Sequence, residues 1–170
     1  FDAHADLRDE LDGEKWSHAC AARRSLDKGA GQLIQIGVRA WSREEAKFSE
    51  NDNRVRTHLA SDILAVSNGQ KVWESLMDEL SMISGPVWIS VDIDVLDGYL
   101  VPSTGTPVPG GLSWWHLESA LATIFESKNW NVLGADVVET VPDIEGSLTP
   151  FTAAMIATRL VGGHIHRSIQ

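Results

Sequence analysis

Two short segments of the 170-residue sequence carry closely spaced acidic and imidazole side chains. They are D-A-H-A-D at 2–6 and S-V-D-I-D-V-L-D at 90–97, with candidate ligands Asp2, His4, Asp6, Asp92 and Asp94. Alternate residues of a strand project to one side, so Asp92 and Asp94 are expected to point together. Because two aligned carboxylates repel each other, this pair favours a bound cation. Either segment alone is equally compatible with solvated loop carboxylates or a helix cap.

The two segments together offer enough ligands for a pair of metal ions. Five Asp and His side chains can hold two divalent ions when some of the carboxylates bridge both. Oxygen-rich ligation with one imidazole suits Mn²⁺ better than Zn²⁺, which prefers more nitrogen and sulfur. Two ions about 3.5–4 Å apart can produce hydroxide from water at neutral pH and polarise an electrophile. The residues therefore indicate a two-metal reaction centre.

The elements that must position these side chains alternate between strands and helices. The predicted strands are 32–38, 87–93 and 131–138, with a further short one at 63–66. The predicted helices are 15–27, 70–84, 113–127 and 149–162, while residues 43–58 are charged and irregular. Such alternation predicts an α/β class with a mainly parallel sheet, where sites gather at the carboxyl ends of the strands.

Three packing expectations accompany these elements. The run at 87–93 is almost continuously apolar, which predicts a strand buried on both faces. Trp73 and Trp88 fall on patterns that face the core. Gly162 and Gly163 predict the end of the last helix, because glycine favours the position after a helix.

Composition and charge exclude several classes of protein. With 43% hydrophobic and 22% charged residues, the chain is expected to fold and not to be disordered. The net charge of −10 argues against a nucleic-acid partner, which would need a basic face. No apolar run approaches the roughly 20 residues that span a bilayer, so no membrane partner is expected. A single cysteine, Cys20, favours a reducing compartment, and we predict a cytoplasmic protein.

Further segments place these motifs in a family context. Beside D-A-H-A-D and S-V-D-I-D-V-L-D, the sequence contains S-H-A-C at 17–20, Q-I-G-V-R at 35–39, T-G-T-P-V-P-G-G-L at 104–112 and D-V-V-E at 136–139. In this order and over essentially the whole chain they resemble the arginase–agmatinase ureohydrolases, and agmatinases most of all. The resemblance implies an arginase-like three-layer αβα fold, two Mn²⁺ ions and hydrolysis of a guanidino group to urea and an amine.

The resemblance also implies a role for each metal-ligand candidate. Asp2 and Asp92 would bridge the two manganese ions. Asp6 would complete one metal site and so take part in catalysis, and His4 with Asp94 would complete the other. Asp97 and Asp136 are expected to support the site structurally without contacting the metal.

Two further residues match family positions that handle substrate. His18 corresponds to the family's catalytic histidine, which contacts substrate and passes a proton to the departing amine. Imidazole suits this task because it titrates near neutral pH. Glu139 corresponds to a glutamate that hydrogen-bonds the planar guanidinium, which suits paired contacts with a carboxylate. Without the family context, His18 is an early helical residue and Glu139 a strand-end residue in a salt bridge.

Two departures from the family pattern shape our expectations. The family's first metal ligand is a histidine in an upstream G-G-D-H segment, which this sequence does not contain, and the chain opens inside the metal motif at Phe1. We therefore expect residues 1–170 to be the larger C-terminal part of a single ureohydrolase domain. Gly98 stands where the family usually has proline, which is expected to loosen that loop slightly.

The predicted function is manganese-dependent hydrolysis of a small cationic guanidino substrate, agmatine above all, to putrescine and urea. Relatives that act on guanidinobutyrate or arginine share these motifs. A second hypothesis is a truncated, non-catalytic remnant that binds metal or another subunit. A deacetylase of the same general fold fits the spacing less well. The resemblance implies a homo-oligomer, a trimer or hexamer, for the complete protein.

Overall fold

The computed structural model describes residues 1–142 and 146–169. Its strands are β1 (Leu33–Val38), β2 (Val55–Leu59), β3 (Gly85–Asp92) and β4 (Trp130–Val138). Its α-helices are α1 (Ala21–Asp27), α2 (Arg43–Asn51), α3 (Ala60–Ile63), α4 (Gly69–Met82), α5 (Trp114–Glu126) and α6 (Leu148–Ile169). Two 3₁₀ turns, η1 (His18–Cys20) and η2 (Ile93–Val95), lie beside the candidate site residues.

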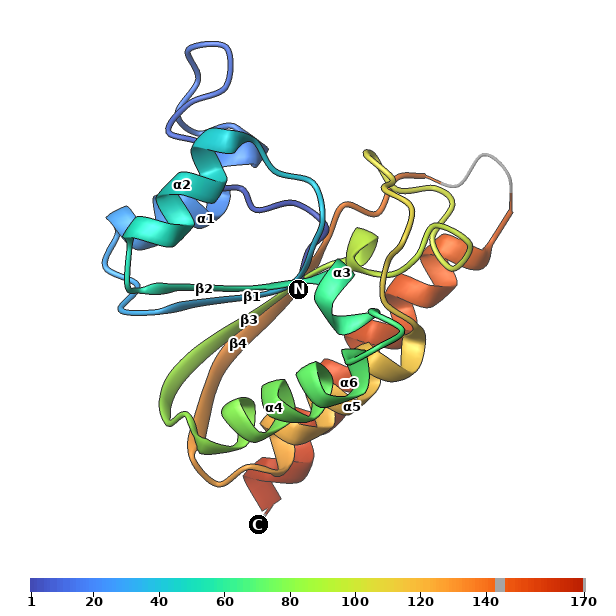
Figure 1. The fold of residues 1–170 in the computed structure, drawn as a ribbon. Helices are drawn as coiled ribbons and strands as arrows, with labels where there is room; N and C mark the ends of the chain where they lie inside the picture. The colour runs from blue at the N-terminus through green and yellow to red at the C-terminus, as the bar shows by residue number, and fades with distance from the viewer. Residues whose placement is uncertain (143–145, 170) are drawn as a thin grey trace.

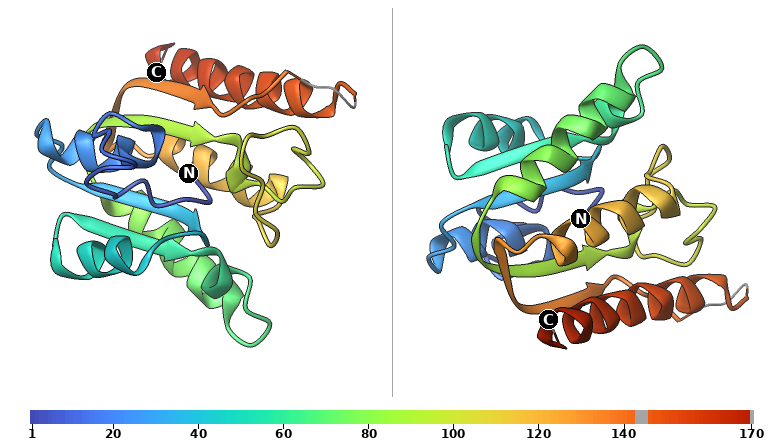
Figure 2. Two further views of the ribbon diagram at one scale, coloured as in Figure 1. Left: turned by 90° about the horizontal axis from the view of Figure 1, so that it is seen from above. Right: turned by 90° about the horizontal axis from the view of Figure 1, so that it is seen from below.

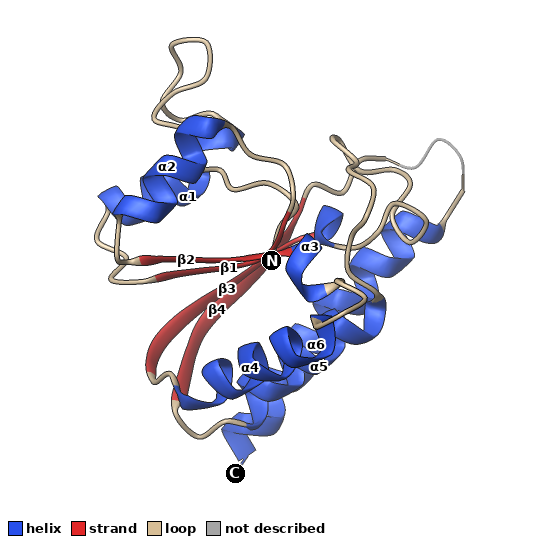
Figure 3. Ribbon diagram, viewed as in Figure 1, coloured by secondary structure: helices blue, strands red, loops and turns tan. Residues whose placement is uncertain are grey.

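The strands form two parallel pairs, β1 with β2 and β3 with β4. Viewed from above, the strands lie side by side, with the N-terminal residues between β3 and β1 (Figure 2). Helices α1 and α2 cover one side of the strands, and α4, α5 and α6 lie on the other (Figure 1). Figure 3 distinguishes helices, strands and loops by colour and shows the long loops near the carboxyl ends of the strands. The predicted α/β class with parallel strands is therefore confirmed.

The core lies mainly between the strands and α4, α5 and α6. It includes Leu76 and Leu80 of α4, Val91 of β3 and Ile156 of α6, each at most 2% exposed. Helix α5 begins with a capping box, because the Ser113 hydroxyl accepts from the main-chain amide of His116 and Nδ1 of the His116 ring accepts from the main-chain amide of Ser113. Within the described residues, we find no helix with both the length and the apolar character needed to cross a bilayer.

The sequence expectation for residues 43–66 is wrong. The stretch 43–58 contains α2 and most of β2. The short strand expected at 63–66 is absent, because α3 ends at Ile63 and the next residues form a turn. A capping box begins α2, where Ser42 accepts from the main chain of Glu45 and the Glu45 carboxylate accepts from the main chain of Ser42. The S-x-x-E spacing was the available signal for this helix. Its high charge reflects an exposed face and not irregular structure.

Three packing expectations are also wrong. β3 is not buried on both faces, because Ile89 and Val91 are buried while Ser90 on the opposite face is exposed. Trp88 is 61% exposed on β3, where its ring lies over Gly134 and its indole N–H donates to Asp136. Helix α6 continues through Gly162 and Gly163 to Ile169. A Cβ on Gly163 would lie 2.4 Å from Cδ2 of Phe125, so this glycine permits close packing of α6 on α5. That contact offsets the cost of about 1 kcal/mol that glycine imposes inside a helix.

Candidate metal centre and substrate pocket

The D-A-H-A-D segment is held between two strands by main-chain hydrogen bonds. The amide of Asp2 donates to Ile36 of β1 at 3.1 Å, and the amide of Asp92 donates to Phe1 at 2.9 Å. On the same strand edge, the amide of Arg39 donates to Ala3 at 2.8 Å. These bonds place Asp2 and His4 at the carboxyl ends of β1 and β3, where a parallel sheet gathers its functional groups.

Three of the candidate ligands form a tight cluster. One ligand atom each of Asp2, His4 and Asp94 lies within 4.8 Å of the other two. The Nδ1 atom of His4 lies 3.0 Å from Oδ2 of Asp94 and 3.5 Å from Oδ1 of Asp2. The structure therefore joins residues that are about ninety positions apart in the sequence, as the metal-site prediction requires.

The expectation that Asp92 and Asp94 project from one strand is wrong in detail. β3 ends at Asp92, and Asp94 lies in η2, the 3₁₀ turn that follows. Oδ1 of Asp92 accepts the amide of Asp94 at 2.9 Å and so caps that turn. Both carboxylates are nevertheless buried, with 7% and 1% of the residue exposed. The turn brings Asp94 to His4 in a way that strand alternation does not describe.

The charges of this cluster are poorly balanced in the protein alone. Burial, with the nearby carboxylates of Asp2 and Asp94, raises the pKa of Asp92 to about 9. The close contact of its imidazole with the carboxylates of Asp2 and Asp94 raises the pKa of His4 to about 10. Burial disfavours the ionised form of Asp94, but His4 and the amide of Ala3 hold the pKa of that carboxyl below its ordinary value. These shifts favour the protonated forms of His4 and Asp92 in the metal-free protein, and a divalent cation would compete with those protons for the same oxygens and nitrogen.

The residues present fit a divalent metal ion. Oδ2 of Asp94 is fully buried and has no hydrogen bond of acceptable geometry, although Nδ1 of His4 is close. Buried carboxylate oxygens are normally satisfied, so an orphaned one marks a place for a cation. Two carboxylates and one imidazole are a ligand set that suits Mn²⁺.

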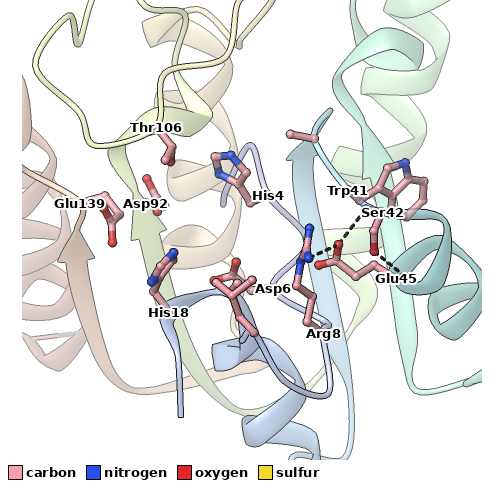
Figure 4. A pocket seen from close by; sticks show the side chains of 13 residues that line it. His4, Asp6, Arg8, His18, Trp41, Ser42, Glu45, Asp92, Thr106 and Glu139 are labelled. Carbon is pink, nitrogen blue, oxygen red and sulfur yellow. Dashed lines mark hydrogen bonds and ion pairs between the residues drawn. The ribbon is translucent and has the colours of Figure 1, made fainter. Parts of the chain in front are cut away.

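The remaining candidates line a pocket beside this cluster (Figure 4). Its volume is about 430 Å³, and five predicted site residues line it, namely His4, Asp6, His18, Asp92 and Glu139. In Figure 4 the side chains of Glu139, Asp92 and His18 come from different segments and lie around one space. The pocket therefore gathers residues from η1, β3 and the chain after β4.

Asp6 and Glu139 share an uncommon backbone conformation. Their φ angles are 52° and 62°, in the left-handed region that most residues avoid. Strained residues of this kind cluster at functional sites, where surrounding structure holds them in place. Burial, followed by the charge of Asp2, also raises the pKa of Asp6 to about 7. Both residues thus differ from ordinary surface carboxylates.

Asp97 and Asp136 have the supporting contacts expected of them. Oδ2 of Asp97 accepts the amides of Gly110 and Gly111, each at 2.9 Å, and so fixes the ends of the loop 97–111. Asp136 accepts hydrogen bonds from Trp88 and Ser90 on β3. Neither of these aspartates lines the pocket described above.

Sequence reasoning missed several residues of this region. Thr106, Trp41 and Glu45 line the pocket, and Arg39 lies directly behind η2. The T-G-T and Q-I-G-V-R segments had drawn attention to Thr106 and Arg39 only as family motifs. The S-x-x-E capping box was the signal that could have located Glu45.

The chain is similar to known proteins over almost all of its length. A sequence profile of the Arginase family matches residues 1–162. An agmatinase from Pyrococcus horikoshii is 38% identical over 162 residues, which cover 95% of this chain and 53% of that protein. An N(1)-aminopropylagmatine ureohydrolase from Thermococcus kodakarensis is 34% identical and is covered to 52%.

A solved structure gives the same result for the fold. The agmatine ureohydrolase of Thermoplasma volcanium superposes with a TM-score of 0.78 and 31% identity, over 95% of this chain and 52% of that one. The chain thus spans about half the length of the relatives it matches. Members of this family are in general binuclear manganese hydrolases. The profile match and the superposed structure together establish that this chain belongs to the arginase family.

Proposed function

We propose that the protein hydrolyses agmatine to putrescine and urea in a manganese-dependent reaction. The observation that carries this proposal is the convergence of His4, Asp6, His18, Asp92 and Glu139 on one pocket of about 430 Å³. Asp2 and Asp94 lie within 3.5 Å of His4 at the same place. The pocket therefore combines a metal-ligand cluster with one imidazole and one carboxylate that are free to meet a substrate.

Five of these residues would hold the metal ions. His4 and Asp94 would belong to one site and Asp6 to the other, while Asp2 and Asp92 would bridge both. When bound, two manganese ions would lower the pKa of a water molecule and stabilise negative charge that develops on it. The burial of Asp92 and Asp94 and the raised pKa of Asp92 support this assignment, because a bound cation would neutralise the charge of these neighbouring carboxylates when both are ionised.

His18 and Glu139 would handle the substrate. The Glu139 carboxylate would accept hydrogen bonds from the guanidinium and turn its central carbon toward the metal centre. The His18 imidazole, exposed at the start of η1, would donate the proton that the departing amine needs. Water adds to the guanidinium carbon, the carbon–nitrogen bond to the alkyl chain breaks, and urea and a protonated primary amine leave.

The substrate is expected to be a cationic guanidino amine. The pocket is lined by the carboxylates of Asp6, Glu45, Asp92 and Glu139 and by the guanidinium of Arg8, so acidic groups predominate and favour a cationic substrate. Agmatine carries a guanidinium and an ammonium group. A second candidate is N(1)-aminopropylagmatine, because a relative with that activity in its name is 34% identical to this chain. The two compounds share the reacting group and differ only in the amine tail.

A substrate comparison tests the proposal. Urea release would be measured with Mn²⁺ and each of agmatine, N(1)-aminopropylagmatine, arginine and guanidinobutyrate. Both the 170-residue chain and the product of the longest reading frame containing it would be assayed. The highest kcat/KM for agmatine supports the proposal, and the highest value for arginine overturns the substrate assignment. Manganese binding without urea release from either protein would instead favour the metal-binding remnant.

The role of His18 has its own test in the same assay. The His18→Asn variant is expected to lose about 100-fold to 10,000-fold in kcat, the usual contribution of a positioned acid or base. Its affinity for Mn²⁺ should stay close to that of the unaltered protein, because His18 is not among the clustered ligands. A variant that keeps its kcat would remove His18 from the mechanism.

We also propose a cytoplasmic location and a homo-oligomeric complete protein, a trimer or hexamer. The single buried cysteine supports a reducing compartment. Several large apolar side chains on the outer surface of α6, Phe151 and Val161 among them, are more than half exposed and could meet another subunit. Analytical ultracentrifugation of the complete protein would test this, and a stable monomer would contradict it.

A further inference from the structure

Among the residues that the structure describes, the side chain of Arg39 donates hydrogen bonds only to main-chain carbonyl oxygens. Its Nη2 atom donates to Asp94 at 2.7 Å, to Leu96 at 3.3 Å and to Val108 at 2.7 Å. Nε donates to Val108 at 3.1 Å, and Nη1 contacts Gly37 at 3.2 Å and Val95 at 3.4 Å. Within the described part of the chain, no carboxylate forms an ion pair with this guanidinium.

These carbonyls belong to segments that carry the candidate site. Asp94 and Val95 lie in η2 and Leu96 directly follows it. The guanidinium donates to the carbonyls of Asp94 and Leu96, and it shares the carbonyl of Val95 with the amide of Leu112. Val108 lies in the loop 97–111, which also carries the pocket residue Thr106. One side chain therefore fixes the Asp94 turn and this loop to the end of β1.

The main chain of the same residue contacts the other ligand segment. The amides of Arg39 and Ala40 both donate to Ala3, at 2.8 Å and 2.9 Å, and Ala3 stands between Asp2 and His4. Arg39 thus connects the D-A-H-A-D segment to the turn that carries Asp94. It does not itself line the pocket, so it is not placed to contact a substrate.

Gly37 supports the same junction from the strand. Its φ is 100°, and a Cβ there would lie 2.6 Å from Cγ2 of Val95. This glycine lets η2 approach β1 closely enough for the Arg39 guanidinium to reach the three consecutive carbonyls of residues 94–96. A lysine could not make the same set of bonds as the Arg39 guanidinium, because its single ammonium group cannot present five N–H donors in a plane.

We propose that Arg39 is a positioning residue for the metal centre. It sets the distance between the Asp2–His4 segment and Asp94 and holds the loop 97–111 against them. The inference rests on the metal site proposed above and assigns no contact with the metal. Residues that orient metal ligands commonly change metal affinity by about 10-fold to 100-fold when they are replaced.

Manganese affinity is the measurement that tests this role. Mn²⁺ would be titrated into the protein at a temperature at which every variant is folded, and free ion would be followed by electron paramagnetic resonance. Arg39→Met is expected to raise Kd about 10-fold to 100-fold, and Arg39→Lys somewhat less. The matched control is Arg56→Met, since Arg56 pairs with Glu79 far from the site and should leave Kd unchanged.

Hydrogen exchange supplies a second readout that does not require metal. In Arg39→Met, the amides of residues 93–112 should exchange faster, while those of α4 and α5 keep the rates of the unaltered protein. Should Arg39→Met fail to fold, Arg39→Lys carries the test.

The outcomes separate this inference from the proposed function. A Kd in the Arg39 variants equal to that of the unaltered protein overturns the positioning role and leaves the metal site standing. A loss of stability in which amides exchange faster throughout the chain, and not mainly at residues 93–112, would also overturn the positioning role. That result would show that Arg39 supports the fold in general. Failure of the unaltered protein to bind Mn²⁺ overturns the proposed metal site and this inference together.

Discussion

Two regions of this molecule bury carboxylates, and they differ in how completely the carboxylate oxygens are hydrogen-bonded. Glu45, at the start of α2, is 3% exposed, yet its Oε1 accepts the amide of Leu7 at 3.1 Å and its Oε2 accepts the amide of Ser42 at 2.7 Å. Arg8 adds an ion pair at 3.6 Å. Asp94 is 1% exposed, and one of its oxygens has no hydrogen bond of acceptable geometry. Both carboxylates lie close to the same pocket.

The difference indicates which carboxylate is available for chemistry. Glu45 already has enough donors, so it stabilises the fold and has little capacity for a ligand. Asp94 has the Ala3 amide and the His4 imidazole beside it, yet its Oδ2 has no hydrogen bond of acceptable geometry. Burial, with the neighbouring carboxylates of Asp2 and Asp94, raises the pKa of Asp92. Burial alone therefore does not identify a metal site. Burial combined with an unsatisfied oxygen and neighbouring like charges does.

The largest expected effect comes from removing the unsatisfied carboxylate. Asp94→Asn should lower Mn²⁺ affinity by at least about 100-fold and abolish measurable ureohydrolase activity of the complete protein, because a ligand and a charge are lost. Calorimetric titration with Mn²⁺ measures the first effect and urea release the second. The metal-free variant should remain folded, since repulsion with Asp92 is relieved.

The same variant has a thermal control. Saturating Mn²⁺ should stabilise the unaltered protein by about 2.7 kcal/mol at 100 times Kd. This increase in Tm should be absent in Asp94→Asn at the same metal concentration. An equal increase in Tm for both proteins would mean that manganese binds elsewhere. Asp94 would then not differ from Glu45 as a metal ligand.

The second prediction concerns the pH dependence of the metal-free protein. The folded-state pKa values of Asp6 and Asp92 are raised to about 7 and about 9, and that of His4 to about 10. A raised pKa stabilises the fold below the unfolded value and loses that contribution as pH rises through the folded value. All three groups therefore act in one direction, and stability should fall as pH increases from about 5 to about 9.

Thermal unfolding across that range measures the effect. We expect Tm of the metal-free protein to fall by on the order of 10 °C between pH 5 and pH 9. With Mn²⁺ the dependence should flatten, because metal binding displaces the same protons and strengthens as pH rises. A metal-free Tm that increases toward pH 9 would contradict the raised pKa of Asp92.

The third prediction tests the satisfied carboxylate. Glu45→Gln should lower the free energy of unfolding by about 1–3 kcal/mol, because a charge-assisted hydrogen bond and the α2 capping box are weakened. Its Mn²⁺ affinity should fall far less than that of Asp94→Asn. Urea denaturation gives the first quantity and metal titration the second. If Glu45→Gln lost as much manganese affinity as Asp94→Asn, the two regions would not be distinct.

Much of the fold could be predicted from local sequence signals. The apolar runs gave β1, β3 and β4 within a few residues, and helical spacing gave α4 and α5. Residues 43–66 could not be assigned in this way, because the charged face of α2 hides its capping box and β2 is short. The exposure of Trp88 was also beyond local reasoning, since it depends on which face of β3 the helices cover.

The candidate site was predictable in its members and not in its geometry. The spacing of Asp2, His4, Asp92 and Asp94 was enough to predict a metal site. It did not reveal that Asp94 reaches His4 from a 3₁₀ turn, because that turn depends on Arg39 and Gly37 behind it. Nor did it give the left-handed backbone of Asp6 and Glu139, which tertiary contacts impose.

The smallest expected effect concerns Glu139, a carboxylate that is exposed and so differs from both Glu45 and Asp94. A Cβ on Gly105 would lie 3.1 Å from Oε2 of Glu139, which is closer than ordinary contact. Gly105→Ala should therefore displace that carboxylate by a few tenths of an ångström and raise KM for the guanidino substrate by about 2-fold to 10-fold. Mn²⁺ affinity should not change, because Glu139 is outside the ligand cluster. Steady-state kinetics beside a metal titration separate the two. An unchanged KM would mean that Glu139 does not orient the guanidinium. A loss of manganese affinity would mean that the loop 97–111, which contains Gly105, also helps to position the metal ligands.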